Sequence, residues 1–200
     1  MKVMGEATLR PAKKKDCHTL AELENIASGG VVDYLFHELM PGYSPIEIVA
    51  HGLKDEHSPH SYVNAIVAEI DGSLAGMVLS FPSSFHGITD EMRAFFPAER
   101  LDHLADFYSA QVEESWYVNS IGVFEEHRRS GVGTKLMKAA EETARENGFH
   151  IMSLIAFADN TPALALYKSL GYEVVRRVSL EGNEFIPHND GCLLLQCTLT

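Results

Sequence analysis

A short glycine-rich turn carries the residues whose types and spacing are best suited to chemistry. Residues 127–134 read HRRSGVGT, between an apolar run that ends at Val123 and a helical pattern that ends at Gly148. Where such a turn opens a helix, successive backbone N–H groups have no partner within the helix, and the helix dipole adds roughly half a positive charge. Gly131 and Gly133 leave those amides uncovered because they have no side chain. The turn therefore predicts a site for a phosphate or a similar anion.

Two other phosphate-binding motifs do not fit this turn. A nucleoside-triphosphate loop has glycine directly before its lysine, whereas Thr134 precedes Lys135 here. A dinucleotide loop has a third glycine where this sequence has Leu136. Glycine spacing after a strand is by itself a weak signal, so the interpretation depends on what surrounds the turn.

The turn and the segment after it resemble the GCN5-related N-acetyltransferase (GNAT) superfamily. The acyl-CoA motif of that family is Gln or Arg, two residues, Gly, one residue, then Gly or Ala, and Arg128, Gly131 and Gly133 meet it. Further along, Tyr167, Gly171 and Tyr172 are similar to the family's second signature, a tyrosine, three residues, a glycine and an aromatic residue. The resemblance covers about residues 116–175.

The resemblance implies acetyl-CoA as co-substrate and a primary amine of a small molecule or peptide as acceptor, with direct attack in a ternary complex and no metal. It makes Tyr167 the catalytic residue, which donates a hydrogen bond or a proton to the departing thiolate. The implied binding residues for CoA are Ile121, Gly122, Val123, Arg128, Arg129, Ser130, Gly131, Val132, Gly133, Thr134, Asn160 and Tyr167.

Several of these residues also have a plainer structural interpretation. Asn160 precedes Thr161-Pro162 and suits a helix N-cap as well as it suits a pantetheine carbonyl. Tyr167 shares a helical face with Leu170, and without the family pattern it would be a half-buried packing residue. Arg128 could pair with a neighbouring glutamate on the surface.

The group that removes the proton from the amine has no motif of its own. An alkylammonium has a reference pKa near 10.4. Its deprotonation to the neutral amine at pH 7 therefore costs about 4 to 5 kcal/mol of free energy unless a base or a desolvating pocket assists. Glu113, Glu114 and Asp33 lie in segments that could line the acceptor side, and Asn119 could face the cleft. The sequence does not choose among them, and a base acting through water is compatible with it.

The remaining patterns predict a mixed α/β fold, and the resemblance implies a mostly antiparallel central sheet with a splayed parallel strand pair and flanking helices. After a first strand that closes at Pro11, Asp16 is a candidate N-cap for a helix with Leu23 inward and Glu24 outward. Later helices are expected at residues 31–40, 45–57, 134–147 and 160–170, and strands at 62–70, 74–81, 116–123, 151–157, 173–180 and 192–199. The strand at 151–157 should run parallel to the one at 116–123, because a helix connects them.

The chain is expected to be a single acyl-CoA N-acyltransferase domain, residues 1–200, with an insertion at about 83–114. The insertion has aromatic residues and helical spacing, which indicates one or two helices over an edge of the sheet. It could form a lid over an acceptor pocket, although a packed insertion with no direct role is the more common case.

Composition limits the partners and the compartment. The net charge of −12 disfavours nucleic acid, because phosphate binding needs a cationic surface. An acidic surface attracts cationic acceptors, although it also serves solubility. Neither a membrane-spanning run nor a signal peptide is evident in the sequence, so a cytoplasmic location is expected. The three cysteines form no metal-type cluster. Exposed strands and aromatic insertions make a homodimer possible.

Two other functions stay open at this point. A regulatory module could bind acyl-CoA without turnover, and an enzyme could use a hydroxyl acceptor instead of an amine. Tyr167 favours an enzyme, because a binding module has no use for a proton donor at the thiolate.

Overall fold

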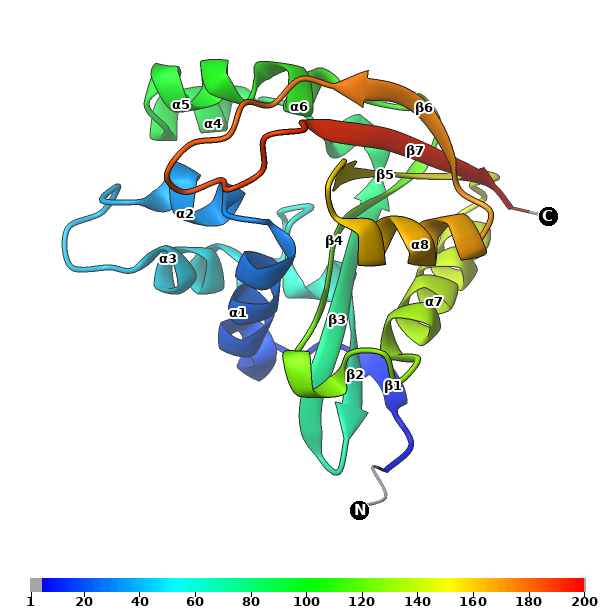
Figure 1. Ribbon diagram of the computed structural model, residues 1–200. Coiled ribbons are helices and arrows are strands. Elements are labelled where there is room, and N and C mark those ends of the chain that lie inside the picture. The colour runs from blue at the N-terminus through cyan, green and yellow to red at the C-terminus, as the bar shows by residue number, and fades with distance from the viewer. Residues whose placement is uncertain (1–4, 200) are drawn as a thin grey trace.

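A seven-stranded sheet forms the centre of the molecule (Figure 1). The structure, a computed structural model, describes residues 5–199. The strands lie in the order β1-β2-β3-β4-β5-β7-β6, with bounds β1 Thr8–Pro11, β2 Ala65–Ile70, β3 Ser73–Pro82, β4 Trp116–Val123, β5 Ile151–Phe157, β6 Glu173–Val178 and β7 Cys192–Thr198. All neighbours are antiparallel except β4 and β5, which confirms the predicted fold class.

The parallel pair separates partway along its length. Strands β4 and β5 are paired only from Trp116 with Met152 to Val118 with Leu154. Beyond Val118, β4 stays paired with β3 on its other side, and β5 stays paired with β7 as far as Phe157. The two strands therefore diverge while each keeps its other neighbour, and their facing backbone edges open into a gap.

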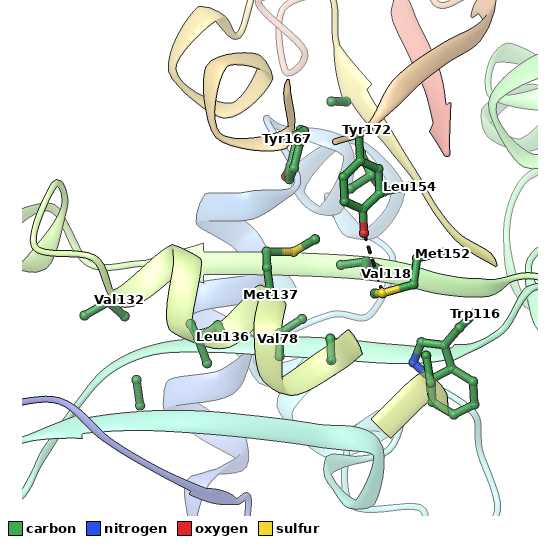
Figure 2. Packing of buried hydrophobic residues seen from close by; sticks show 14 of the residues in the cluster. Val78, Trp116, Val118, Val132, Leu136, Met137, Met152, Leu154, Tyr167 and Tyr172 are labelled. Atoms are coloured by element: carbon green, nitrogen blue, oxygen red, sulfur yellow. Dashed lines mark hydrogen bonds between the residues drawn. The ribbon is translucent and has the colours of Figure 1, made fainter. Parts of the chain in front are cut away.

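Helices cover both faces of the sheet. On one face lie α7 (Val132–Glu146) and α8 (Thr161–Ser169), and on the other lie α1 (Cys17–Ala27) and α3 (Pro45–Gly52), beside the short α2 (Val31–Phe36). Figure 2 shows the first face, where Leu136 and Met137 of α7 pack over Val78 and Val118. The alternation of strand side chains supplies both cores, because neighbouring residues such as Val67 and Ala68 point to opposite faces.

The insertion at about 83–114 holds three short helices, rather than the one or two expected. They are α4 (Asp90–Phe95), α5 (Ala98–His103) and α6 (Ala105–Ser109). Leu101 and Leu104 are buried against α2 and the segment between β6 and β7. Arg176 of β6 pairs with Asp106 of α6 at 3.0 Å. The insertion is therefore attached to the sheet at the edge formed by strand β6.

Two helices end earlier than their patterns predict. Helix α2 stops at Phe36 instead of residue 40, because His37 leaves the helical region (φ −54°, ψ 125°) and Glu38 has a positive φ. Helix α3 stops at Gly52 instead of residue 57, although its predicted start is confirmed by the capping box of Ser44 and Glu47. Asp16 precedes α1 as predicted, but its carboxylate binds the Lys13 amide and Arg10 instead of capping that helix.

Candidate active site

The turn before α7 presents a row of free backbone donors. Gly131 is the N-cap of α7 with φ +87°, and no side chain caps the helix. Arg129 also has a positive φ, of 62°. Within the described residues, the amides of residues 129–134 donate to no protein acceptor, and the first hydrogen bond of α7 runs from Lys135 to Gly131. A run of amides in this geometry forms an anion-binding nest at a helix N-terminus.

Two side chains of the turn hold its shape. The Nε atom of Arg128 donates to the carbonyl of Val123 at 3.1 Å, which ties the turn to the end of β4. The Ser130 hydroxyl donates to the His127 carbonyl at 2.5 Å. Arg128 thus supports the loop through the backbone and not through the surface ion pair considered from the sequence. Arg128 also lines the cleft described below.

Gly122 is required by close packing, and Gly133 stands at a close contact with a neighbouring helix. A Cβ on Gly133 would lie 3.3 Å from Leu166 of α8, so glycine lets α7 start close to α8. A Cβ on Gly122 would lie 2.4 Å from the carbonyl oxygen of Leu23, because α1 crosses β4 at this point. Gly122 therefore has a structural role in addition to its predicted place beside the pantetheine, and it brings α1 directly against the open end of β4.

One cleft joins the turn to the gap between β4 and β5. Its volume is about 2250 Å³, and its walls come from distant parts of the chain. The predicted residues that line it are Ile121, Gly122, Val123, Arg128, Arg129, Gly131, Gly133, Thr134, Asn160 and Tyr167. Ser130 and Val132 belong to the same turn without lining the cleft. Val132 is buried, so only its backbone can face a ligand.

Asn160 caps its own helix. Its Oδ1 accepts from the Ala163 amide at 3.3 Å, which is the N-cap interpretation of the sequence. The Nδ2 group is not needed for the cap. It is therefore available as a donor at the cleft wall, so the two interpretations are compatible.

Tyr167 projects from α8 into the core beside Tyr172 (Figure 2). The residue is 6% exposed and its ring centroid lies 5.8 Å from that of Tyr172. Tyr172 donates its hydroxyl to Met152 Sδ, whereas within residues 5–199 the Tyr167 hydroxyl has no hydrogen-bond partner in the protein. Tyr167 lines the cleft, so its hydroxyl is free to donate to a ligand there.

Burial makes Tyr167 a weak acid. It raises the pKa of the phenol to about 12. Complete transfer of its proton to a thiolate with a pKa near 8.5 would be uphill by about 5 kcal/mol. A hydrogen bond to the thiolate is therefore the more favourable contribution of this residue, in agreement with the weaker of the two roles expected from the sequence.

Glu24 is the acidic residue that the sequence patterns missed. We expected it to face water from α1, but it lines the cleft, and its Oε2 atom is buried without a hydrogen-bond partner in the described part of the chain. Burial raises the pKa of its carboxyl to about 7. A buried carboxylate without a partner is unfavourable unless a ligand supplies one. The sequence feature that could have indicated this position of α1 is Gly122, because a glycine in the middle of a strand marks a close approach of another backbone.

The other candidates for the general base lie in positions that suit this role less well than that of Glu24. Glu113 and Glu114 are exposed, and neither they nor Asp33 line the cleft. Asn119 of β4 does line it, together with His60. Burial lowers the pKa of His60, and a hydrogen bond with Asn119 partly offsets this effect. Among the acidic candidates, Glu24 is the one with a carboxyl oxygen both buried and unpaired beside β4.

Two further features concern metals and membranes. Within residues 5–199, no group of three or more His, Cys, Asp or Glu side chains is arranged to hold a metal ion. The same residues contain no helix with the length and apolar character that a membrane span requires.

Comparison with known proteins identifies the class to which this fold and cleft belong. The family model described as "Acetyltransferase (GNAT) family" matches residues 32–172, which is more than half of the chain. The chain therefore belongs to the GNAT acetyltransferase family, and the resemblance found in the motifs is confirmed.

Curated relatives match parts of the chain. An N-alpha-acetyltransferase of Sulfurisphaera tokodaii is 29% identical over 123 residues, which are 60% of this chain and 63% of that protein. The catalytic subunit of the N-terminal acetyltransferase B complex of Arabidopsis thaliana is 37% identical over 68 residues, 32% of this chain and 39% of that protein. Each match spans less than two thirds of the relative's own length.

Solved structures match nearly the whole chain in fold. An N-acetyltransferase from Staphylococcus aureus Mu50 has a TM-score of 0.69 at 18% identity, over 95% of this chain and 100% of that chain. A putative acetyltransferase from Salmonella typhimurium, solved with its cofactor acetyl-CoA, has a TM-score of 0.61 at 19% identity, over 98% and 95% of the two chains. At such identities the likeness establishes the fold alone.

Proposed function

We propose that this protein is an acetyl-CoA-dependent N-acetyltransferase that acetylates a primary amine by direct attack within a ternary complex. The observation that carries the proposal is the single cleft that the free amides at the start of α7, the open edges of β4 and β5, Tyr167 and Glu24 all border. A donor bound at one end and an acceptor at the other would meet in the gap between the two strands.

The chain offers a matching group for each part of CoA. The amides of residues 129–134 hold the diphosphate, and Arg128 and Arg129 add positive charge beside it. The backbone groups of residues 121–123 pair with the pantetheine arm as an added strand would, and Asn160 donates through its Nδ2 group. These contacts direct the thioester toward the point where β4 and β5 separate.

The thioester supplies an electrophilic carbonyl and a thiolate leaving group, and the protein manages the protons and charges around them. Glu24 accepts a proton from the ammonium group, because its pKa of about 7 lets it act as a base near neutral pH. The neutral amine nitrogen adds to the acetyl carbon, the carbon–sulfur bond breaks to release the CoA thiolate, and that thiolate takes the second proton of the nitrogen to become the thiol. An amide near Ile121 or Gly122 faces the carbonyl oxygen, and the Tyr167 hydroxyl donates to the departing sulfur.

The same proposal extends to the expectations that rest on the sequence alone. Residues 1–200 form one acyltransferase domain, the acceptor is cationic, and the protein acts in the cytoplasm. Assembly as a homodimer stays a prediction, with no residue of the site requiring a second copy.

Two measurements test the proposal. Titration calorimetry should show that CoA and acetyl-CoA bind, and mass spectrometry should show a gain of one acetyl group on an amine when thiol is released. If no CoA species binds, the enzyme and the regulatory module both fail. If acetyl-CoA binds and no amine in a broad panel is acetylated, the regulatory module is favoured, and acetylation of an alcohol instead would make the acceptor a hydroxyl.

A further inference from the structure

The acceptor end of the cleft has an aromatic wall built by the insertion. Phe36 of α2 packs edge-on against Phe96 at 5.1 Å between ring centroids, and Phe96 packs edge-on against Phe95 at 5.0 Å. These three side chains all line the cleft, and Phe107 and Tyr108 of α6 continue the same wall. The insertion is therefore part of the acceptor site, and not only a packed addition to the fold.

The charge of Glu24 lies within reach of this wall. Tyr108 lines the cleft and is half-buried, and its pKa is raised first by burial and then by the negative charge of Glu24. The unpaired Oε2 atom of Glu24 thus faces a site with aromatic rings nearby. An ammonium group satisfies such a carboxylate, and aromatic faces add cation–π attraction.

The α1–α2 turn and the segment between β6 and β7 both border the cleft, through Gly29 and through Pro187 and His188. Here the α1–α2 turn meets the segment between β6 and β7, which passes over α2 in Figure 1. A Cβ on Gly30 would lie 1.9 Å from the carbonyl oxygen of Phe185, and a Cβ on Gly29 would lie 2.9 Å from His188 Nε2. The Phe185 ring also packs 4.6 Å from His37. The two segments are in contact, so an extended polypeptide has no path between them.

Part of the rim is apolar, although charged side chains such as Lys54 and Glu91 also line the cleft. Met40, Tyr43 and Phe95 line the cleft and are exposed by 39%, 58% and 47% of their surface. A peptide that entered here would place its backbone N–H and C=O groups against side chains that offer few partners. A compact molecule with an apolar body would bury its surface against the same side chains.

We propose that the acceptor is a small arylalkylamine: its ammonium group is received by Glu24, and its ring lies against Phe36, Phe95 and Phe96. This inference rests on the proposed function, because it names the acceptor of that same site. It favours a free small molecule over the protein N-termini named for some of the relatives.

The test compares acceptors of different chemistry under one assay. Benzylamine, phenethylamine, 4-phenylbutylamine and tryptamine are compared with propylamine, spermidine and a tetrapeptide with a free N-terminus, with thiol release and product mass as readouts. We expect the best arylalkylamine to exceed propylamine in kcat/KM by about 30-fold or more, the effect of burying one aromatic ring. Equal or higher kcat/KM for spermidine or the peptide would overturn this inference while leaving acetyl transfer established.

Variants of two phenylalanine residues test where the aromatic ring of the acceptor binds. Phe95 and Phe85 are both exposed, by 47% and 53%, but Phe85 does not line the cleft. We expect Phe95→Ala to raise the KM for the best arylalkylamine by about 5-fold to 10-fold. Phe85→Ala should leave this KM unchanged. An unchanged KM in Phe95→Ala, or equal effects in the two variants, would contradict the proposed placement, whereas loss of CoA binding in the unmodified protein would refute the proposed function itself.

Discussion

The two ends of the cleft are built in different ways. The proposed CoA end comes mainly from one stretch, β4, the turn and α7, with β5 and the start of α8 beside it, and it offers mainly backbone donors. The acceptor end comes from α1, α2, the insertion and the segment between β6 and β7, and it offers side chains. Local backbone geometry can be recognised in a sequence, whereas an assembly of distant side chains cannot. The predictions below test this division, from the largest expected effect to the smallest.

Replacing Glu24 should have the largest effect on activity. Glu24→Gln removes the proposed base, so kcat/KM should fall by roughly 10²-fold to 10⁴-fold, while CoA affinity stays unchanged. The wild-type pH profile should rise through about pH 7, where Glu24 loses its proton, and this limb should be absent in the variant. Steady-state kinetics across pH 5.5 to about 9 measures both effects.

Glu22 provides the matched control for this experiment. It lies on the same helix and pairs with His18 at 3.6 Å on the exposed side. Glu22→Gln should therefore retain wild-type kinetics and the limb near pH 7. If Glu24→Gln and Glu22→Gln behaved alike, another group would have to be the base.

The same Glu24 variant should be more stable than the wild type at alkaline pH. The folded-state pKa of about 7 is above the unfolded value, so the folded protein holds its proton to higher pH and loses stability as pH rises from about 4.5 to 7. Above that range, Glu24→Gln should have a free energy of unfolding up to about 3 kcal/mol higher. At pH 4 the two proteins should be equally stable. Urea unfolding at pH 4 and pH 8 compares them, and a difference that does not depend on pH would exclude the buried charge as its cause.

Removing the Tyr167 hydroxyl should affect turnover and not donor binding. Tyr167→Phe keeps the ring packed beside Tyr172 but removes the hydrogen bond to the thiolate, so kcat should fall by about 10²-fold. Calorimetry should give the same Kd for CoA in both proteins. A variant with full activity would show that Tyr167 only packs the core, the plainer interpretation of its position.

Alanine variants at two glycines distinguish an effect on anion binding from an effect of backbone strain. Gly131 and Gly148 stand at opposite ends of α7 with φ of 87° and 79°, and a Cβ on either would meet no atom within 4 Å. Alanine at either position should lower the free energy of unfolding by about 1 kcal/mol. Only Gly131→Ala should also weaken CoA binding, by about 5-fold to 10-fold, because it alters the amides that are proposed to hold the diphosphate. Equal CoA affinity in the two variants would place the anion elsewhere.

The difference between the two ends also explains which helix faces were predicted correctly. In α7 the buried residues follow a single stripe against the sheet, so periodicity identifies them, and Leu136 and Met137 are buried as expected. Helix α1 contacts the core with one face and the cleft with another. Periodicity places Glu24 among the polar residues, but it does not distinguish a polar residue facing water from one facing a binding site.

The sequence by itself determined the mixed sheet, the parallel pair and the glycine-rich turn with its free amides, because these depend on strand order and on glycine positions within one local segment. The tertiary structure alone decided that Glu24 lines the cleft, that the insertion adds aromatic side chains to the cleft wall and that the α1–α2 turn contacts the segment between β6 and β7. Each of these features depends on contacts between residues far apart in the chain, such as Gly122 with Leu23 and Gly30 with Phe185. No pattern within a single segment records which distant segment will pack against it.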